Sequence, residues 1–368
     1  PTILVPWRRF VDESSYTLKS IERHLPVMPY VRESRRIIGL DTLTARDIKR
    51  IGWPAVARRT YRSAVAVGDY AVDLHNCNQE ADLEAGLETV DDVPAGFVHG
   101  PFQIPFEVFV PTGMDGFLAA EKNLSLSRLA SGACRLQPIT MLTGQASGAI
   151  AALSVRQDVQ PRDLEPVVVQ KVLVEAGSRL TLSEFLDVPR GSSAWQDVQL
   201  TAVQGVMTGD ADGRFWPERE ATRAEVAAVV ARLFSVNLEP VPATSTFADV
   251  APSDWFFPYI EALHRKGWIL GCSTDPTRFC PSELQDRRGF AVMLARGLDL
   301  ELIEPQEAFW LDVPPSDFGF LEIEALTRVG ILEPCALSAK HFCPAEPIVR
   351  AHASGLAARC MLRDWSWH

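Results

Sequence analysis

Residues 101–155 read PFQIPFEVFVPTGMDGFLAAEKNLSLSRLASGACRLQPITMLTGQASGAIAALSV, and this stretch decides how the first half of the chain is expected to fold. Residues 106–110 are aromatic and β-branched and lie between two prolines, which predicts a short strand. Residues 117–120 form a second apolar run of strand length, which predicts a buried strand. Residues 136–155 are rich in Ala, Leu and Met, so we expect a helix there. The stretch therefore predicts an α/β unit.

Three segments of this stretch, GFLAAEK, GACRLQPIT and GQASG, resemble the C-terminal end of FAD-dependent oxidoreductases with the glutathione-reductase type of nucleotide-binding fold. In that family the N-terminus of the last helix lies close to the pyrophosphate and ribityl chain of FAD. A helix N-terminus suits an anion because its N–H groups are unpaired and its dipole is positive there. The resemblance implies that the cofactor-binding residues are Glu121, Arg135, Gly144 and Gln145. The residues by themselves also fit a small-residue helix packed on a strand.

Two upstream segments, residues 25–39 (LPVMPYVRESRRIIG) and residues 63–77 (SAVAVGDYAVDLHNC), are similar to segments of the same family. The resemblance implies a catalytic group made of Arg32, Asp73 and His75. Asp73 and His75 are two residues apart, so a strand would place both on one face. A His beside a carboxylate can act as a general base, and an arginine can bind an anionic substrate or stabilise a reduced flavin. The alternative is a structural Asp–His hydrogen bond beside a solvated arginine face.

The chain contains no G-x-G-x-x-G sequence after an expected strand. That fingerprint opens the βαβ unit that holds the FAD pyrophosphate, and in this family it precedes the matching region. Residues 1–180 therefore correspond to the C-terminal half of the oxidoreductase module, with a mixed sheet. We expect FAD to bind only with the missing N-terminal half, supplied by an upstream segment or a partner chain. The chain begins at Pro1 without a signal-peptide pattern, which suggests a fragment of a longer protein.

From residue 181 the sequence repeats with a period of roughly 60 residues, which indicates a repeat architecture. The copies occupy residues 181–238, 244–300 and 307–362. Each copy opens with F/W-x-D-V, continues through an amphipathic helix and a turn loop, and ends in a second helix. This pattern, clearest in GDADGRFWP and TRAE of the first copy, resembles the S-layer homology (SLH) domain. Three copies in that family form a mainly helical, three-lobed prism that binds anionic secondary polymers of the bacterial cell wall.

The arginine of the T-R-A-E motif contacts the polymer in that family, which implies a polymer-binding role for Arg223, Arg287 and Arg350. Thr222 and Glu225 of the first copy have the spacing of a capping box, which is a structural role. The second and third copies depart from T-R-A-E. We therefore expect the groove of the first copy to dominate binding, and Arg223→Ala to leave the fold intact because the capping pair stays.

The cysteines of the second and third copies share one spacing. Cys272 and Cys280 are eight residues apart, Cys335 and Cys343 repeat this spacing, and the first copy lacks both members of the pair. Cysteines that come and go together predict the disulfides Cys272–Cys280 and Cys335–Cys343. A four-cysteine zinc site is the alternative, but the spacing is wider than usual for zinc ligands, so no metal site is predicted. The other cysteines are expected to be buried apolar residues rather than nucleophiles: Cys77, Cys134 and Cys360.

The 368-residue chain is 47% hydrophobic and carries a net charge of -11. This charge argues against nucleic-acid binding through a basic surface, and no apolar run approaches the ~18 residues that span a membrane. The SLH resemblance implies a multidomain, secreted protein located at the cell surface or cell wall. The favoured function is a surface-anchored FAD-dependent oxidoreductase whose present chain is inactive alone. The alternative is a non-catalytic S-layer or wall-anchoring protein with a remnant oxidoreductase region.

Overall fold

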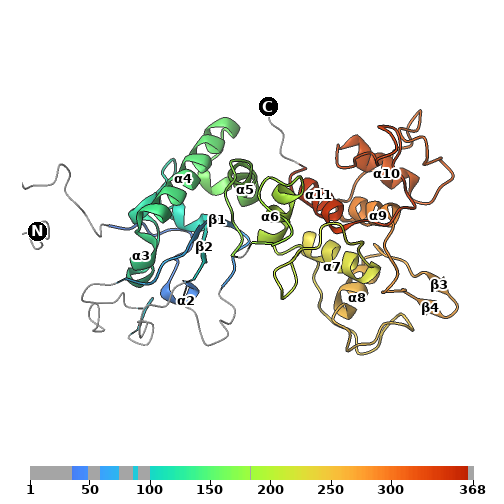
Figure 1. Ribbon diagram of the computed structural model, residues 1–368, viewed down its shortest axis with the longest axis horizontal. Helices are drawn as coiled ribbons and strands as arrows, with labels where there is room; N and C mark the ends of the chain where they lie inside the picture. Colours follow the sequence, from blue (N-terminus) through green and yellow to red (C-terminus); the bar gives the residue numbers. More distant parts are fainter. Residues whose placement is uncertain (1–34, 49–58, 74–85, 90–99, 183, 364–368) are drawn as a thin grey trace, which may run out of the picture. The chain divides into compact units, whose positions relative to one another are not determined.

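A computed structural model describes residues 35–48, 59–73, 86–89, 100–182 and 184–363 (Figure 1). Arg32, His75 and Cys77, which the sequence analysis singled out, lie outside the described residues. The chain forms two compact units. The first comprises Pro1–Arg59, Gly68–Gly100 and Glu107–Gly148, and the second comprises Thr60–Val67, Pro101–Phe106 and Ala149–His368.

The first unit is built from short helices around a small apolar core. Its elements are α2 (Ala45–Ile48), α3 (Arg128–Cys134), the first part of α4 (Gln137–Gln157), and the 3-10 helices η6 (Phe106–Phe109) and η7 (Glu121–Asn123). Leu43, Phe109 and Leu129 are fully buried in this core. Ser127 begins α3, and its hydroxyl accepts a hydrogen bond from the N–H of Ala130 at 3.2 Å. This cap satisfies one of the N–H groups that a helix start leaves unpaired.

The strands predicted at residues 106–110 and 117–120 are wrong, whereas the helix predicted over residues 136–155 is confirmed as α4. The apolar side chains of residues 106–110 are buried together, and such a continuous run does not distinguish a strand from a helix by its period. The N–H of Leu40 binds the carbonyl groups of Glu107 and Val110 at 3.1 and 2.9 Å. These bonds accompany a turn of the chain into η6.

The sheets in the described part of the chain are smaller than the mixed sheet that the sequence analysis expected. Strands β1 (Ala64–Gly68) and β2 (Phe102–Pro105) form one two-stranded sheet. The buried amide of Gln170, on α5 (Pro166–Glu175), donates to the carbonyl groups of Arg62 and Ala64 at 2.7 and 2.9 Å. Prolines separate α4 from α5: the 3-10 helix η8 (Pro161–Asp163) precedes α5, and Pro166 starts it.

The rest of the second unit consists of three pairs of helices, one pair per sequence repeat. The first helices are α6 (Trp195–Val203), α8 (Phe257–Arg265) and α10 (Phe320–Arg328). The second helices are α7 (Arg223–Leu233), α9 (Arg287–Gly297) and α11 (Arg350–Met361). In Figure 1 the second helices gather at the centre of this region, with the first helices around them. A small antiparallel hairpin, β3 (Ser273–Thr274) with β4 (Thr277–Arg278), projects from the second repeat.

The three repeats close into a ring. The second helix of each repeat packs against the first helix of the next, since α7 contacts α8, α9 contacts α10, and α11 returns to α6. Antiparallel bridges join the segments before the second helices, linking Glu220 to Val349, Thr222 to Leu284 and Asp286 to Pro347. Each repeat therefore contacts both of the others.

The aspartate of each F/W-x-D-V motif holds the corner of its own repeat. Asp187 accepts hydrogen bonds from the N–H groups of Phe215 and Trp216 at 2.8 and 2.7 Å. The equivalent bonds run to Asp249 from Phe279 and Cys280, and to Asp312 from Phe342 and Cys343. The second residue of each corner has a positive φ, of 59° at Trp216, 59° at Cys280 and 56° at Cys343. The repeated motif thus encodes a bend in the backbone.

Candidate functional site

The arginines of the T-R-A-E positions join neighbouring repeats. Arg350 begins α11 and donates from Nε to the carbonyl of Phe215 at 2.7 Å and from a terminal nitrogen to the carbonyl of Thr208 at 2.8 Å. Its guanidinium lies 4.7 Å from the Phe215 ring centre. Arg223 binds the loop of the second repeat in the same way, and Arg287 binds the loop of the third. Burial lowers the pKa of Arg223, Arg287 and Arg350 from the ordinary arginine value.

These contacts alter the expectation for Arg223→Ala. The predicted capping box is confirmed: Thr222 accepts from the N–H of Glu225, and Glu225 accepts from the N–H of Thr222 at 2.9 Å. The capping pair does not, however, replace the bonds from Arg223 to the carbonyl groups of Phe279 and Leu270, at 2.8 and 3.1 Å. Loss of Arg223 leaves both carbonyl groups without this donor, so the substitution carries a structural cost.

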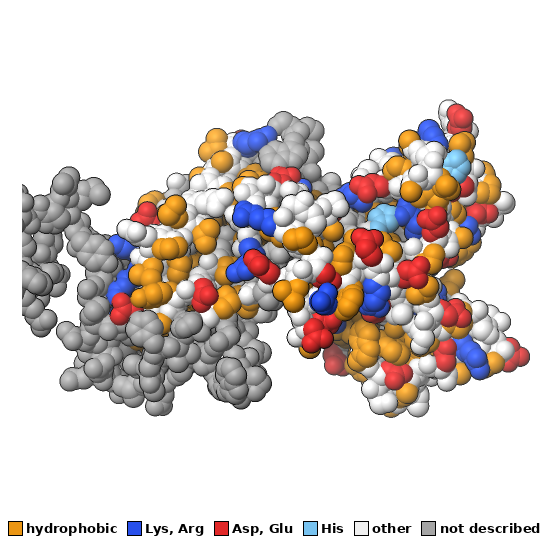
Figure 2. Space-filling view, viewed as in Figure 1, with side chains coloured by type: hydrophobic (Ala, Val, Ile, Leu, Met, Phe, Trp, Pro, Cys, Tyr) orange, Lys and Arg blue, Asp and Glu red, His pale blue; other side chains and the backbone are white. Residues whose placement is uncertain are grey.

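A cavity of about 260 Å³ lies beside the first repeat. Its polar and aromatic lining residues come from the loop after α6, from α7, from the second repeat and from the third: Asp210, Trp216, Arg219, Glu225, Arg232, Trp255 and Arg350. Trp216 and Trp255 are 45% and 55% exposed, so two large aromatic faces are accessible from solvent. The space-filling view shows Lys and Arg side chains beside hydrophobic ones in the region of α7 and α8 (Figure 2). We refer to this space as the groove cavity.

The arginines of the groove cavity differ in how they are neutralised. Arg219 pairs with Glu225, and hydrogen bonds from Arg219 and Thr222 lower the pKa of Glu225 although burial alone raises it. Arg232 instead approaches the Tyr259 hydroxyl at 3.2 Å and lies 5.1 Å from the centre of its ring. Arg350 donates to carbonyl groups. Among the described residues neither Arg232 nor Arg350 forms an ion pair with a carboxylate, so both charges are available to an anion.

Asp210 fixes the position of Trp216 at the edge of the cavity. The indole Nε1 of Trp216 donates to the Asp210 carboxylate at 2.5 Å, and the N–H groups of Asp212 and Arg214 donate to the other carboxylate oxygen at 2.9 Å. The hydrogen bond from Trp216 is the main reason that the pKa of Asp210 is lowered. The Arg214 guanidinium lies 5.3 Å from the Trp216 ring centre. The tryptophan is therefore held in one orientation without being buried.

The second and third repeats have different residues at the positions that line the groove cavity. Trp216 is replaced by Cys280 and Cys343, Arg219 by Glu283 and Glu346, and Glu225 by Gly289 and His352. The replacement at Arg219 reverses the charge, and the replacement at Trp216 removes the aromatic face. The departure from T-R-A-E is visible in the sequence alone. The importance of these other positions is not, because their place in the cavity depends on contacts between repeats.

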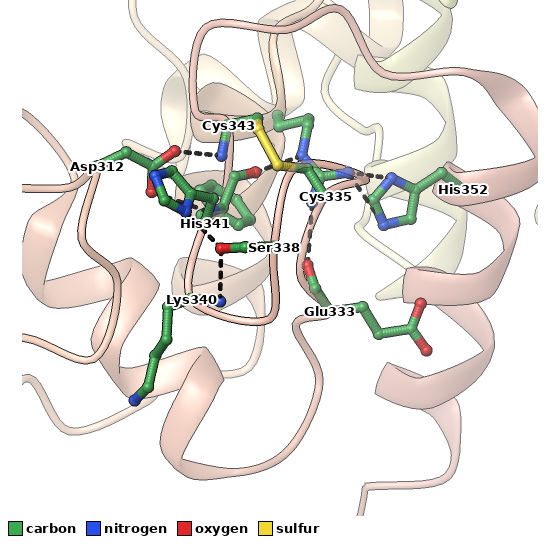
Figure 3. The surroundings of a disulfide bond; sticks show 10 residues. Asp312, Glu333, Cys335, Ser338, Lys340, His341, Cys343 and His352 are labelled. Carbon is green, nitrogen blue, oxygen red and sulfur yellow. Dashed lines mark hydrogen bonds between the residues drawn. A yellow bond between two sulfur atoms is a disulfide. The ribbon is translucent and has the colours of Figure 1, made fainter.

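The predicted disulfides are confirmed. Cys272 is bonded to Cys280 and Cys335 to Cys343, with Cα atoms 6.1 and 5.9 Å apart. Figure 3 shows the second bond beside Asp312, with His341 and Ser338 hydrogen-bonded at 2.6 Å in the same loop. Zinc ligation requires free thiolates, so these bonds exclude the four-cysteine zinc alternative for these residues.

Cys134 and Cys360 are buried, as expected, and are the free cysteines of the described part of the chain. Burial raises the pKa of each thiol to about 12. Because the thiolate is the nucleophilic form, neither residue has the character of a catalytic cysteine.

In the first unit the structure brings together Arg135 and Asp73 from the predicted site residues. Arg135 is 5% exposed and donates to the backbone carbonyl of Asp73 at 2.7 Å, with the Asp73 carboxylate 3.6 Å away. Glu121 begins η7 with a positive φ of 55°. The contacts between Arg135 and Asp73 let Arg135 position the segment that contains Asp73.

The other two predicted cofactor residues, Gly144 and Gln145, lie on α4. A Cβ atom added at Gly144 or at Gly148 would meet no heavy atom within 4 Å. Met141, on the same helix, is 75% exposed. The small residues and the open space beside them fit the close approach of a flat group such as FAD, or of another backbone.

Comparison with known proteins assigns both parts of the chain. Residues 8–173 match the profile of the FAD dependent oxidoreductase family, and residues 184–227 and 246–271 match the S-layer homology domain. The chain therefore contains an FAD-dependent oxidoreductase region followed by SLH sequence. It is a two-part protein, mostly helical with few small sheets in its described residues.

Curated relatives include the S-layer protein of Bacillus thuringiensis subsp. finitimus, which is 26% identical over 48% of this chain and 21% of its own length. The endoglucanase of Bacillus sp. (strain KSM-635) is 34% identical over 31% of this chain and 11% of its own length. The S-layer protein sap of Bacillus anthracis is 27% identical over 40% of this chain and 18% of its own length. The matched part thus spans about a fifth or less of these relatives. The SLH sequence and the S-layer relatives indicate a location at the cell surface. No described helix combines the length and hydropathy that crossing a membrane requires.

Proposed function

We propose that residues 181–362 form three SLH repeats, arranged as a three-lobed helical prism, that anchor this protein to an anionic secondary polymer of the cell wall. The observation that carries the proposal is the groove cavity, where two exposed tryptophans stand beside arginines without carboxylate partners. The third repeat, at residues 307–362, is included because α11 closes the ring on α6 and supplies Arg350 to that cavity.

The chemistry of the groove cavity suits a charged polysaccharide. The apolar face of a sugar ring can pack on Trp216 or Trp255, which present rigid aromatic surfaces. A carboxylate or phosphate on the sugar can bind the planar donors of Arg232 and Arg350. We therefore assign the main polymer contact to these two arginines. Arg223 and Arg287, predicted from the same motif, make equivalent backbone contacts to the second and third repeats but do not line the groove cavity.

Sedimentation with purified cell-wall sacculi tests this assignment. Trp255→Ala and Arg232→Gln are the informative variants, because Trp255 is largely exposed and the Arg232 guanidinium contacts the side chain of Tyr259 rather than a carboxylate. Each substitution is expected to weaken binding at least about tenfold. Added salt should weaken the binding of the wild-type chain, because salt screens exposed charges. Arg296→Gln is the matched control, since Arg296 occupies the position of Arg232 in the second repeat and pairs with Glu322. Equal sedimentation of Arg232→Gln and wild type would reject the groove cavity as the polymer site.

We also propose that residues 1–180 are the C-terminal half of an FAD-dependent oxidoreductase, which binds the cofactor only with the missing N-terminal half. FAD would supply the redox chemistry, while Gly144 and Gln145 on α4 would line its site and Arg135 would position Asp73. Asp73, His75 and Arg32 remain the proposed catalytic residues. The open space beside Gly144 and Gly148 leaves room for a cofactor along this face of α4, which supports the proposal.

Flavin absorbance after desalting tests the second proposal. The present chain alone is expected to be colourless, because it lacks the glycine-rich phosphate-binding loop. A longer chain with that loop is expected to be yellow, and Gly144→Leu should reduce its flavin content by filling the open space beside α4. Flavin bands in the present chain, or a colourless longer chain that is folded, would contradict the proposal.

A further inference from the structure

The third repeat contains a second cavity, of about 510 Å³, which shares no lining residue with the groove cavity. The segment before Trp310, the helix α10 and Lys340 form its wall. We refer to it as the third-repeat cavity. Apolar and polar side chains line it together, and Phe309 and Ile303 are 41% and 48% exposed.

A buried carboxylate lies in the wall of the third-repeat cavity. Glu324, on α10, is only 7% exposed. Its Oε1 atom accepts a hydrogen bond from the N–H of Phe309 at 2.9 Å, which is its one hydrogen bond to the described residues. An ionised carboxylate has about four acceptor positions, and a buried charge is stable only with partners. Glu324 therefore has unused acceptor capacity beside an open cavity.

The second repeat shows which donors satisfy the equivalent carboxylate. Glu261 occupies the position of Glu324 and is 6% exposed. It accepts from the N–H of Thr246 at 2.8 Å, from the Thr246 hydroxyl at 2.8 Å and from the Ser245 hydroxyl at 3.2 Å. In the second repeat, two neighbouring hydroxyl groups thus donate to the carboxylate in addition to the backbone N–H.

The third repeat has lost both of these hydroxyl groups. Ala308 and Phe309 precede Trp310 as Ser245 and Thr246 precede Phe247. The backbone bond to the carboxylate is retained by Phe309, whereas neither side chain has a donor. The third-repeat cavity therefore lies where internal hydroxyl donors are missing.

We propose that the third-repeat cavity binds one unit of a carbohydrate, whose adjacent hydroxyl groups donate to Glu324 in place of the two hydroxyls found in the second repeat. The apolar side chains of Ile303, Pro305 and Phe309 provide a surface for the C–H groups of the sugar. The Lys340 ammonium, 3.7 Å from the Phe309 ring centre, is a donor for the sugar's oxygens. In Figure 3 its side chain points away from the neighbouring disulfide.

The charges in the lining favour a neutral ligand over a cation. Glu307 and Glu324 are matched by Arg328 and Lys340 around the same cavity. An ammonium ligand would satisfy Glu324 but would also face the two basic side chains. This inference depends on the third repeat alone and not on polymer binding in the groove cavity.

Ligand-observed NMR on the full chain tests the inference with methyl mannoside, methyl glucoside and methyl galactoside as probes, and with butylammonium as the cationic alternative. At least one glycoside is expected to bind with a millimolar dissociation constant, and butylammonium is not. The double substitution Ala308→Ser with Phe309→Thr supplies the donors of the second repeat. It should weaken glycoside binding at least about tenfold and raise the thermal stability of the protein.

Two further variants make each outcome decisive. Glu324→Gln retains the size of the side chain and an acceptor for Phe309, and it should also weaken glycoside binding. Trp255→Ala, in the groove cavity, should leave it unchanged. The inference is overturned if no glycoside binds, if butylammonium binds instead, or if binding survives both third-repeat substitutions and is lost in Trp255→Ala.

Discussion

His352 is a buried histidine that lies among arginines. It occupies on α11 the position that Glu225 has on α7, and its ring contacts the guanidinium of Arg287. Burial, followed by the positive charges of Arg287 and Arg359, lowers the pKa of His352 from 6.5 to about 4. The folded protein therefore keeps this ring neutral, and its protonation opposes folding.

The free energy of unfolding should consequently fall as the pH drops from about 6.5 to about 4, because the unfolded chain takes up a proton there that the folded chain does not. The contribution of His352 is fully present above this range and amounts to about 3 kcal/mol at most. Urea unfolding at pH 7 and at pH 4.5 measures it. His352→Gln should show a smaller decrease than wild type, whereas His341→Gln, in the exposed disulfide loop, serves as the control. Equal decreases in wild type and His352→Gln would refute this account.

The T-R-A-E motif identifies equivalent arginines but does not reveal which repeat each arginine contacts. The repeat pattern correctly picked out Arg223, Arg287 and Arg350 as equivalent. It did not reveal that each one contacts the following repeat, because Arg350 and Phe215 are 135 positions apart and no local pattern records such a pairing. The role expected for Arg223 in polymer binding stays a prediction, and Arg350 is the motif arginine that lines the cavity with Trp216.

Among the secondary-structure elements, the three second helices begin in different ways. The helix α7 has a capping box, and Asp286 caps α9 by accepting from the N–H of Gly289 at 2.8 Å. Val349, at the start of α11, provides no side-chain cap. Its backbone is extended like that of Thr222 and Asp286, with ψ angles of 154°, 161° and 161°. The backbone at Val349 is therefore suited to a capping side chain.

Val349→Asp should raise the free energy of unfolding by about 1 kcal/mol, because the new carboxylate can accept from the first turn of α11 as Asp286 does in α9. Thr222→Val is the matched variant and should lower the free energy of unfolding by about the same amount. Thermal unfolding monitored by circular dichroism measures both. A stabilising effect of Val349→Asp is excluded if its midpoint is at or below that of wild type.

The contrast between correct and wrong predictions of elements has a physical origin. The helix α4 and the capping box of α7 depend on local composition and on three-residue spacing, and both were predicted from the sequence. Residues 106–110 are apolar at every position except Glu107, so their pattern has no period that separates a strand from η6. Tertiary hydrogen bonds to Leu40 accompany the observed turn there.

For the whole molecule, the repeats and both disulfides follow from the sequence, whereas the residue contacts that close the ring do not. Closure depends on α11 packing on α6, and the hydroxyl groups of Thr201 and Ser354 meet at 2.7 Å in that buried contact. Gly355 allows the approach, because an added Cβ would lie 3.1 Å from the carboxylate of Asp197. The sequence reveals each repeat by itself, whereas the need for a small residue opposite the partly buried Asp197 follows only from the packing of α11 on α6.

Deletion of residues 301–368 distinguishes a closed ring from an open array. In an open array, loss of the last repeat removes only its own interface with the second repeat. In the closed ring it also uncovers the face of α6 that packs on α11 and removes Arg350 from the groove cavity. The truncated chain should therefore lose binding to sacculi, and the amide protons of α6 should exchange with solvent at least about a hundredfold faster, while those of α7 and α8 change less. Arg350→Gln in the full chain is the control, because it should reduce binding while α11 continues to protect α6. Unchanged protection of α6 after the deletion would show that the repeats are stable as a linear stack.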